Sequence, residues 1–242
     1  MRVAVLGASG MVGHGVLDAC LRDPRVEDVL VVGRTPLNTV HPKVRQITHA
    51  DFTDFGALQD ELRGLDACFY CLGVSAAGRT EAEYTRITYD YTLAAARAVS
   101  ADNPALTFTY VSGEGTDSTG TSRTMWARVK GRTENDLLAL PVHAYMFRPG
   151  YIRPGAGAVS RTAAYRWTYR LTSWLYPLLH RLAPRHTTTT EQLGRAMIAT
   201  VGLDGRGPHV LDSSAINRLG TPGPAGPAAP GERPEPEGVP TA

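Results

Sequence analysis

The chain has 242 residues, of which 43% are apolar and 20% are charged, and it carries a formal net charge of +2. This length and composition suit one large or two small globular domains, and the near-neutral balance argues against a nucleic-acid partner. The 3 cysteines are too few for a disulfide framework or a four-thiolate zinc site, and the histidines show no metal-binding spacing, so we expect no metal centre.

The amino terminus lacks the pattern of a targeting signal. Met1 leads directly into the short apolar run 2–6, whereas a secretory signal peptide has a longer apolar stretch and a small-residue cleavage site. No apolar run approaches the ~18 residues of a membrane span. We therefore expect a cytoplasmic protein without a membrane partner.

Short β-rich runs alternate with helical patterns along the chain. Strands are expected at residues 3–6, 29–32, 44–48, 67–71, 106–111, 143–147 and 209–211. Helices are expected at residues 11–21, 57–62, 81–99, 124–140, 163–182 and 191–201, and Thr80 with Glu83 forms a capping box at the start of the third of them. The alternation predicts an α/β fold with a doubly wound, mostly parallel sheet and helices on both faces. Ligands of such sheets bind beyond the carboxyl ends of the strands.

The last segment differs in composition from the rest of the chain. Seven of the 17 prolines lie between Pro222 and Pro240, among Gly, Ala and Glu without apolar periodicity. Such a segment buries too little surface to offset its ordering entropy. We therefore predict a domain over residues 1–218, with a small substrate region from about residue 151, and a disordered Pro/Gly-rich tail over residues 219–242. The alternative for the tail is a proline-rich docking peptide.

A glycine-rich turn follows the first expected strand. Residues 7–13 read Gly-Ala-Ser-Gly-Met-Val-Gly and lead directly into helical sequence. Glycines let the backbone approach a pyrophosphate closely, and the helix that follows presents free N–H groups to the anion. The position between strand and helix is typical of a Rossmann-type dinucleotide-binding fold, although a tight turn without a ligand is the alternative. The predicted cofactor contacts in this turn are Gly7, Ser9, Gly10, Met11, Val12 and Gly13.

The residues after the second expected strand distinguish binding of NAD from binding of NADP. NAD-binding units usually place an acidic residue here for the adenosine ribose, but this strand is followed by Gly33-Arg34-Thr35-Pro36. The guanidinium of Arg34 suits a 2′-phosphate, so we predict NADP in preference to NAD. The alternative is an ordinary exposed arginine. Asp51 and Phe52, after the third strand, are predicted to flank the adenine, and Asp51 is equally suited to capping a turn.

Further motifs accompany the glycine turn and Gly33-Arg34. They are Tyr110-Val111-Ser112-Gly113, Val129-Lys130-Gly131 and Phe147-Arg148-Pro149-Gly150. With these motifs the chain resembles, over roughly residues 1–215, the atypical short-chain dehydrogenases/reductases, in particular the Tat-interacting-oxidoreductase-like proteins and their NAD-dependent epimerase/dehydratase-like bacterial relatives. The resemblance implies an oxidoreductase that acts on a small-molecule carbonyl substrate.

The resemblance also implies roles for single residues. Ser112 matches the serine that polarises the substrate carbonyl, and Lys130 matches the lysine that holds the nicotinamide ribose. Further cofactor contacts are implied at Leu72, Gly73, Pro149, Gly150 and Tyr151. The position of the usual catalytic tyrosine, four residues before Lys130, holds Trp126. Four residues place both side chains on one helical face, so the register is consistent.

Trp126 changes the chemistry because an indole N–H donates a hydrogen bond but does not titrate usefully. Three interpretations remain open. The first is a reductase whose proton comes from Ser112, from the ribose through Lys130, or from a loop carboxylate, Glu114 or Asp117. A hydroxyl from Tyr151 is a further candidate. The second is an NADP(H)-binding regulator or partner-binding module without turnover, and the third is a non-redox reaction such as an isomerisation.

Two other patterns need an interpretation. The aromatic segment 163–182 places apolar residues on one helical face, and Pro177 is expected to break or kink it. A core or dimer-facing helix, a lid over an apolar substrate and a membrane-surface helix are the alternatives, and a homodimer is compatible with the first. Cys68 and Cys71 form a C-x-x-C pattern, but on a strand they point to opposite faces, so we expect no redox or metal role.

Overall fold

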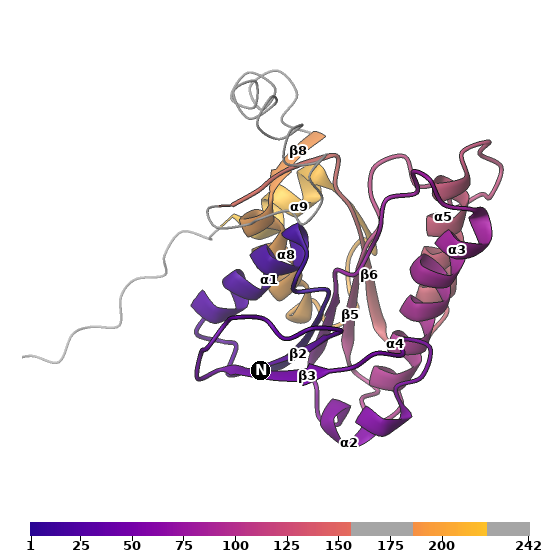
Figure 1. Ribbon diagram of the computed structural model, residues 1–242. Helices are drawn as coiled ribbons and strands as arrows, with labels where there is room; N and C mark the ends of the chain where they lie inside the picture. Colours follow the sequence, from indigo (N-terminus) through magenta and orange to yellow (C-terminus); the bar gives the residue numbers. More distant parts are fainter. Residues whose placement is uncertain (156–185, 222–242) are drawn as a thin grey trace, which may run out of the picture.

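The computed structural model describes residues 1–155 and 186–221. Its centre is a seven-stranded sheet in the order β3-β2-β1-β4-β5-β6-β9, in which every strand pair is parallel (Figure 1). The strands are β1 Arg2–Leu6, β2 Asp28–Gly33, β3 Val44–Thr48, β4 Ala67–Tyr70, β5 Thr107–Val111, β6 His143–Arg148 and β9 Val210–Asp212. The order reverses between β1 and β4, so the expected doubly wound Rossmann-type sheet is confirmed.

Helices cover both faces of the sheet (Figure 1). On one face lie α1 Met11–Arg22, α8 Thr190–Val201 and α9 Ser213–Gly220. On the other face lie α2 Gln59–Leu62, preceded by the 3₁₀ turn η1 Gly56–Leu58, α4 Tyr91–Ser100 and α5 Met125–Leu138. The short helix α3 Glu81–Thr85 continues into α4 through the π-helical turn η2 Arg86–Asp90.

The period of two along the strands builds the two cores. In β1, Ala4 and Leu6 pack with α4 and α5, whereas Val3 and Val5 pack with α1 and α8, and all four side chains are fully buried. Burying a Val or Leu side chain contributes about 1.5–3 kcal/mol. A strand that is apolar on both sides is therefore stable only between two helical layers, which is the arrangement observed.

Two glycines bring α1 and α8 into close contact. A Cβ at Gly15 would lie 2.4 Å from the Cβ of Thr190, and one at Gly194 would lie 2.7 Å from the Cβ of Ala19. Both distances are shorter than real carbon contacts, so only glycine permits this approach. The contact holds the helix that follows the glycine turn against the carboxyl-terminal part of the chain.

The structure corrects several expected boundaries. The helix expected at 81–99 is three consecutive segments, and the capping box of Thr80 and Glu83 at its start is confirmed. Helix α9 and the two-stranded parallel sheet of β7 Tyr151–Arg153 and β8 Thr187–Thr189 were not expected. Since α9 ends at Gly220, the predicted domain end at residue 218 falls inside a helix. The segment 163–182 and most of the predicted tail lie outside the described residues.

The C-x-x-C pattern has the expected geometry. Cys68 is buried with the α4 and α5 layer, and Cys71 packs against the opposite core. Burial raises the pKa of both thiols well above its ordinary value. Both groups therefore stay protonated and unreactive near neutral pH. Among the described helices, none is long and apolar enough to cross a membrane.

Candidate functional site

The glycine turn after β1 lies at the point where the strand order reverses. Gly7 has a φ of +84°, and a Cβ there would lie 2.6 Å from the backbone nitrogen of Leu72. A Cβ at Gly13 would lie 2.2 Å from the carbonyl oxygen of Gly7. The turn therefore requires glycine twice, once for its conformation and once for the approach of α1.

The amino end of α1 is open to an anion. Gly10 is its N-cap, no side chain caps the first turn, and no acidic residue lies in that turn. The N–H groups of a first helical turn have no partner within the helix, and the helix dipole adds positive potential there. The residues at this turn therefore fit a pyrophosphate.

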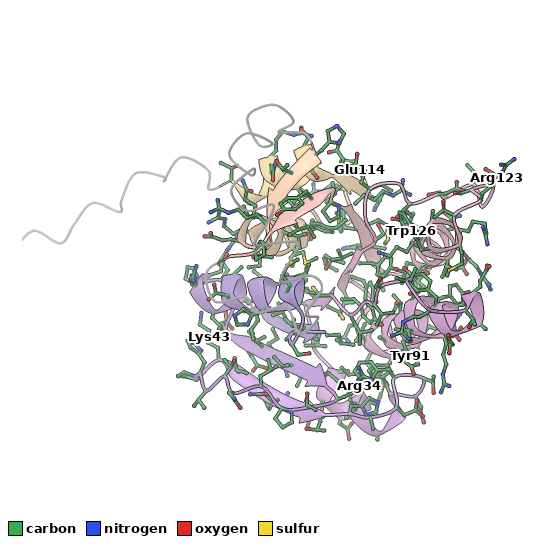
Figure 2. The ribbon with its side chains drawn as sticks, turned by 45° about the horizontal axis from the view of Figure 1, so that its top comes forward. Arg34, Lys43, Tyr91, Glu114, Arg123 and Trp126 are labelled. Atoms are coloured by element: carbon green, nitrogen blue, oxygen red, sulfur yellow. The ribbon has the colours of Figure 1, made fainter. Side chains whose placement is uncertain are left out.

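Arg34 lies directly after β2, the neighbour of β1, and its side chain is exposed. It forms no ion pair or hydrogen bond with any other described residue, so its guanidinium is available to a ligand. Figure 2 shows Arg34 near the lower edge of the molecule, well apart from Trp126 and Glu114. This separation suits a long ligand that reaches from one end of the site to the other.

The residues predicted to flank the adenine have other roles. The carboxylate of Asp51 accepts hydrogen bonds from the N–H and the hydroxyl of Thr53, and these bonds lower its pKa, so Asp51 caps a turn. Phe52 is only 2% exposed and packs against Phe55 and Tyr91 in the core. The Phe52 ring is therefore part of the core, and the predicted adenine contact at Asp51 and Phe52 stays a prediction.

A cavity of about 580 Å³ opens at the carboxyl ends of β5 and β6. Its wall combines small apolar residues with a few polar groups, as small-molecule sites usually do. The cavity is lined by Val74, Ser75, Ala76, Ala77, Tyr84, Ser112, Gly113, Glu114, Trp126, Lys130, Pro149 and Gly150. The structure thus brings together Ser112, Lys130, Trp126, Pro149 and Gly150, which lie far apart in the sequence.

Lys130 reaches this cavity from α5. Its ammonium group donates a hydrogen bond to the backbone carbonyl of Ser112 and lies 6.0 Å from the ring centre of Trp126. Burial lowers the pKa of Lys130 to about 8, while the nearby carboxylate of Glu134 opposes that shift. An ammonium has three donors, so two remain for a ligand such as a ribose.

The position of α5 depends on one close backbone contact. A Cβ at Gly131 would lie 1.7 Å from the carbonyl oxygen of Asp117, and the N–H of Asp117 donates to the carbonyl of Ala127 over 3.1 Å. Gly131 therefore lets the helix lie directly against the loop after β5. This contact places Lys130 next to Ser112.

Ser112 lines the cavity, but its hydroxyl is held by partners within the protein. The side chain is 3% exposed, and its oxygen is bonded to the carboxylate of Glu134 and lies 3.1 Å from the carbonyl oxygen of Phe147. A hydroxyl has a single hydrogen, and the protein offers it two acceptors. In this arrangement Ser112 links β5, β6 and α5, and its role in polarising a substrate carbonyl stays a prediction.

Glu134 is a residue that the sequence analysis missed. It is fully buried, and Nε of Arg148 lies 3.0 and 3.1 Å from its two carboxylate oxygens. The second guanidinium nitrogen of Arg148 also contacts this carboxylate. The pair joins α5 to the end of β6, and Glu134 also contacts Ser112, which lines the cavity. Its signal in the sequence is the spacing of four residues from Lys130, which places both side chains on one face of α5.

The two loop carboxylates differ in surroundings. Asp117 accepts hydrogen bonds from the N–H groups of Thr119 and Ser122 and from the Thr119 hydroxyl, and these bonds lower its pKa to about 2. It acts as a turn residue and does not line the cavity. Glu114 does line the cavity, and its Oε1 lies 2.6 Å from Nδ1 of His186. Figure 2 shows Glu114 and Trp126 on the same upper side of the molecule.

The loop after β6 completes the cavity wall. The N–H of Glu114 donates to the carbonyl of Pro149 over 2.9 Å, and the N–H of Gly150 donates to the hydroxyl of Ser213 over 2.9 Å. Tyr151 follows in β7 and is half-buried. Pro149 and Gly150 therefore line the cavity, and their contact with a cofactor stays a prediction.

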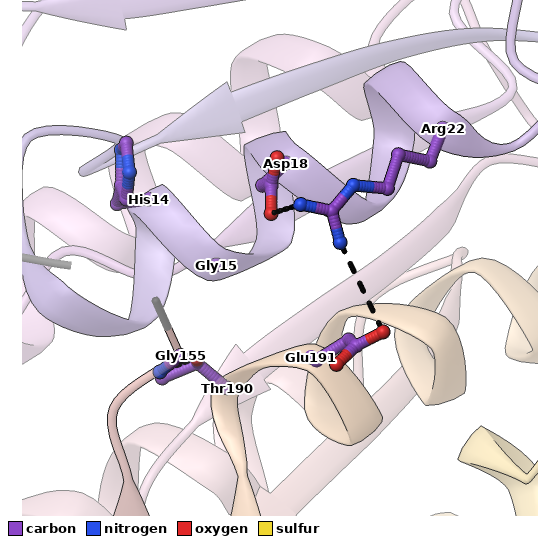
Figure 3. A pocket seen from close by; sticks show the side chains of 7 residues that line it. All are labelled: His14, Gly15, Asp18, Arg22, Gly155, Thr190 and Glu191. Carbon is purple, nitrogen blue, oxygen red and sulfur yellow. Dashed lines mark hydrogen bonds and ion pairs between the residues drawn. The ribbon is translucent and has the colours of Figure 1, made fainter. Parts of the chain in front are cut away.

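A second cavity, of about 90 Å³, lies between α1 and α8 (Figure 3). Arg22 extends across it, 2.6 Å from the carboxylate of Asp18 and 3.9 Å from that of Glu191. His14 lies on the same helix, one turn before Asp18. The charges in this cavity are mutually paired and its volume is small, so we assign it to the packing of the two helices.

A model of the NAD dependent epimerase/dehydratase family matches residues 3–123. The chain is 30% identical over 152 residues to Protein FMP52-2, mitochondrial, of Scheffersomyces stipitis, a match that covers 61% of this chain and 65% of that protein. It therefore spans slightly less than two thirds of the length of that relative. Over 226 residues it is 25% identical to Protein HTATIP2 of Rattus norvegicus, covering 86% of this chain and 92% of that protein.

Solved structures share the fold. An oxidoreductase of the short chain dehydrogenase/reductase family from Burkholderia thailandensis has a TM-score of 0.62 at 17% identity, over 89% of this chain and 92% of that chain. WbmH of Bordetella bronchiseptica, solved in complex with NAD+, has a TM-score of 0.60 at 16% identity, over 87% and 74% of the two chains. Together with the family match over half of the sequence, these likenesses confirm the expected resemblance to atypical short-chain dehydrogenases/reductases: the chain belongs to the NAD dependent epimerase/dehydratase family.

Proposed function

We propose that this protein is an NADP(H)-dependent oxidoreductase that acts on a small carbonyl compound. The observation that carries the proposal is a shared position: the open amino end of α1 and the cavity lined by Lys130 both lie at the carboxyl edge of the sheet. A reduced nicotinamide supplies a hydride when bound. Lys130 would hold the ribose with its remaining donors, and the backbone of Leu72, Gly73 and Pro149 would line the cofactor. WbmH, which has the same fold, was solved with NAD+.

The preference for NADP rests on Arg34. A charge-assisted hydrogen bond contributes about 1.5–3 kcal/mol, which corresponds to roughly a tenfold to hundredfold change in affinity. We expect Arg34→Ala to raise the Kd for NADPH by that factor and to leave the Kd for NADH unchanged, measured by calorimetry. Arg97→Ala is the matched control, because Arg97 is exposed, unpaired within the described chain, and lies in the last turn of α4 at the other edge of the sheet. Equal affinity of the wild type for both cofactors would contradict the preference.

The rival proposal is an NADP(H)-binding regulator without turnover. It is favoured by Trp126 at the tyrosine position and by the engagement of the Ser112 hydroxyl with Glu134. The reductase and the regulator are distinguished by measuring NADPH oxidation by the wild type and by Trp126→Tyr, with 4-nitrobenzaldehyde and 9,10-phenanthrenequinone as carbonyl substrates. Turnover by the wild type supports the reductase. Turnover that appears only in the tyrosine variant supports the regulator.

A further inference from the structure

A carbonyl reductase needs a proton for the oxygen of its product, and the usual phenol is absent from this site. The ionisable side chains that line the described cavity are Tyr84, Glu114 and Lys130. One donor of the Lys130 ammonium is bonded to the Ser112 carbonyl, and the other two are assigned above to the cofactor ribose. Tyr84 is buried at 2% exposure with an interaction of its own. Glu114 is the carboxyl group that reaches the cavity from its rim.

We propose that Glu114 and His186 form the proton-donating pair of this site, with Glu114 as the donor and His186 as the relay to solvent. This rests on the reductase function proposed above. Glu114 Oε1 lies 2.6 Å from His186 Nδ1, and the two residues are 72 positions apart in the sequence. Their side chains are 52% and 63% exposed, so the pair joins the cavity to water.

The backbone is built to hold the Glu114 carboxylate in this place. The N–H of Glu114 is fixed by the carbonyl of Pro149 at 2.9 Å. The other carboxylate oxygen, Oε2, lies against Gly150, where a Cβ would be 2.4 Å from that oxygen and 2.4 Å from the carbonyl oxygen of His186. Any larger residue at position 150 would displace one partner of the pair. Glycine is therefore required for the carboxylate to lie between the cavity and the imidazole.

The carbonyl carbon of the substrate accepts the hydride of the reduced nicotinamide, and the carbonyl oxygen forms an O–H bond with the proton of Glu114 Oε2. Glu114 Oε1 then takes the Nδ1 proton of His186 as the other ring nitrogen, Nε2, accepts a proton (H⁺) from the solvent, so the imidazole stays neutral and the carboxyl group is protonated again. Histidine suits this relay because its two ring nitrogens can pass a proton from solvent to the carboxylate, and the His186 side chain is largely exposed. A carboxylate bound to one ring nitrogen also fixes the tautomer and orientation of the ring.

The test combines kinetics with a measurement on the protein without cofactor. General acid catalysis contributes about 10²–10⁴-fold, so we expect Glu114→Gln and His186→Ala each to lower kcat by at least about 10²-fold with NADPH affinity unchanged. Added imidazole is expected to restore turnover to His186→Ala and not to Glu114→Gln. Nitrogen NMR of the free wild-type protein is expected to show the Nδ1–H tautomer of His186, which Glu114→Ala abolishes. Glu27→Gln is the control, since Glu27 is 77% exposed and pairs only with the N-terminus among the described residues.

Each result decides the proposal. Wild-type kcat in Glu114→Gln or His186→Ala, failure of imidazole to restore His186→Ala, or an unchanged tautomer in Glu114→Ala would overturn the pair. A loss in Tyr84→Phe together with full activity in Glu114→Gln would assign the proton to the phenol. A wild type without turnover on the carbonyl probes would overturn the reductase function itself, and the proton pair with it.

Discussion

At the scale of single residues, the buried charge of Lys130 gives a pH-dependent stability. Its pKa is about 8 in the folded protein, whereas an unfolded lysine titrates near 10.4. Between these values the unfolded chain binds more protons than the folded chain, so the free energy of unfolding rises with pH. The destabilising effect of the charge is therefore complete below about pH 8 and is relieved as the pH approaches 10.

We expect the difference in unfolding free energy between wild type and Lys130→Met to shift in favour of the wild type by up to about 2–3 kcal/mol from pH 8 to pH 10. Urea unfolding of both proteins without cofactor, at several pH values, measures this difference. Parallel pH curves would show that Lys130 titrates normally and that its ammonium is not desolvated.

The Glu134–Arg148 pair gives a second prediction at this scale. Glu134 is fully buried and Arg148 is 23% exposed, so Glu134→Gln leaves the guanidinium without its charged partner in a poorly solvated place. Breaking a buried pair in this way costs about 3–5 kcal/mol. The matched control is Glu61→Gln, which breaks the Arg45–Glu61 pair, where both side chains are 42% exposed. Its cost is expected to stay below about 1 kcal/mol. Equal losses in urea unfolding would contradict the account of the buried pair.

Which residues were predictable follows from the range of their interactions. The role of the glycines at positions 7 and 13 could be predicted from the sequence, because a tight turn directly before a helix requires glycine through local contacts. The surroundings of three other candidates depend on partners 20 or more residues away in the sequence. Ser112 contacts Glu134, Phe52 contacts Tyr91, and Glu114 contacts His186. No local sequence pattern indicates such long-range pairs. The sequence could therefore identify these three residues as candidates for the site, but it could not predict their contacts.

At the scale of elements, the contact between α1 and α8 depends on small residues. A Cβ at Gly15 would overlap Thr190 at 2.4 Å, and overpacking of this kind costs about 1–3 kcal/mol. We therefore expect Gly15→Ala to lower the free energy of unfolding by that amount. Gly202→Ala is the control, because its nearest neighbour would lie 3.7 Å away and its φ of −74° suits alanine. Equal stability of the two variants, measured by urea unfolding, would contradict the close contact.

Elements with a strong hydrophobic period were predicted within a few residues, because burial on two faces enforces the pattern. The strand expected at 44–48 matches β3, and the helix expected at 11–21 matches α1. The π-helical turn at Arg86–Asp90 was not predicted, because a single turn of five residues is too short to show a period of its own in the sequence. Strands β7 and β8 are three residues each and pair across a long separation in sequence, so neither carries a pattern of its own.

At the scale of the whole molecule, the parallel sheet places residues from four separate strands around one edge. Gly7, Leu72, Ser112 and Pro149 each follow a different strand of the central sheet, in the spatial order β1-β4-β5-β6. This convergence was predictable, since parallel strands connected through helices leave all their carboxyl ends on one side. The small carbonyl substrate, the homodimer and the cytoplasmic location remain predictions. The relative from Scheffersomyces stipitis is named as a mitochondrial protein.

The central claim is that the glycine turn and the amino end of α1 bind the diphosphate of NADP(H). Calorimetric titration of the full chain with NADPH tests it most directly, with Gly13→Ala as the variant and Gly202→Ala as the control. The account predicts one NADPH per chain for the wild type and the control, and at least tenfold weaker binding by Gly13→Ala, because its Cβ would lie 2.2 Å from the Gly7 carbonyl oxygen. No binding by the wild type at millimolar NADPH, or unchanged binding by a folded Gly13→Ala, would contradict it.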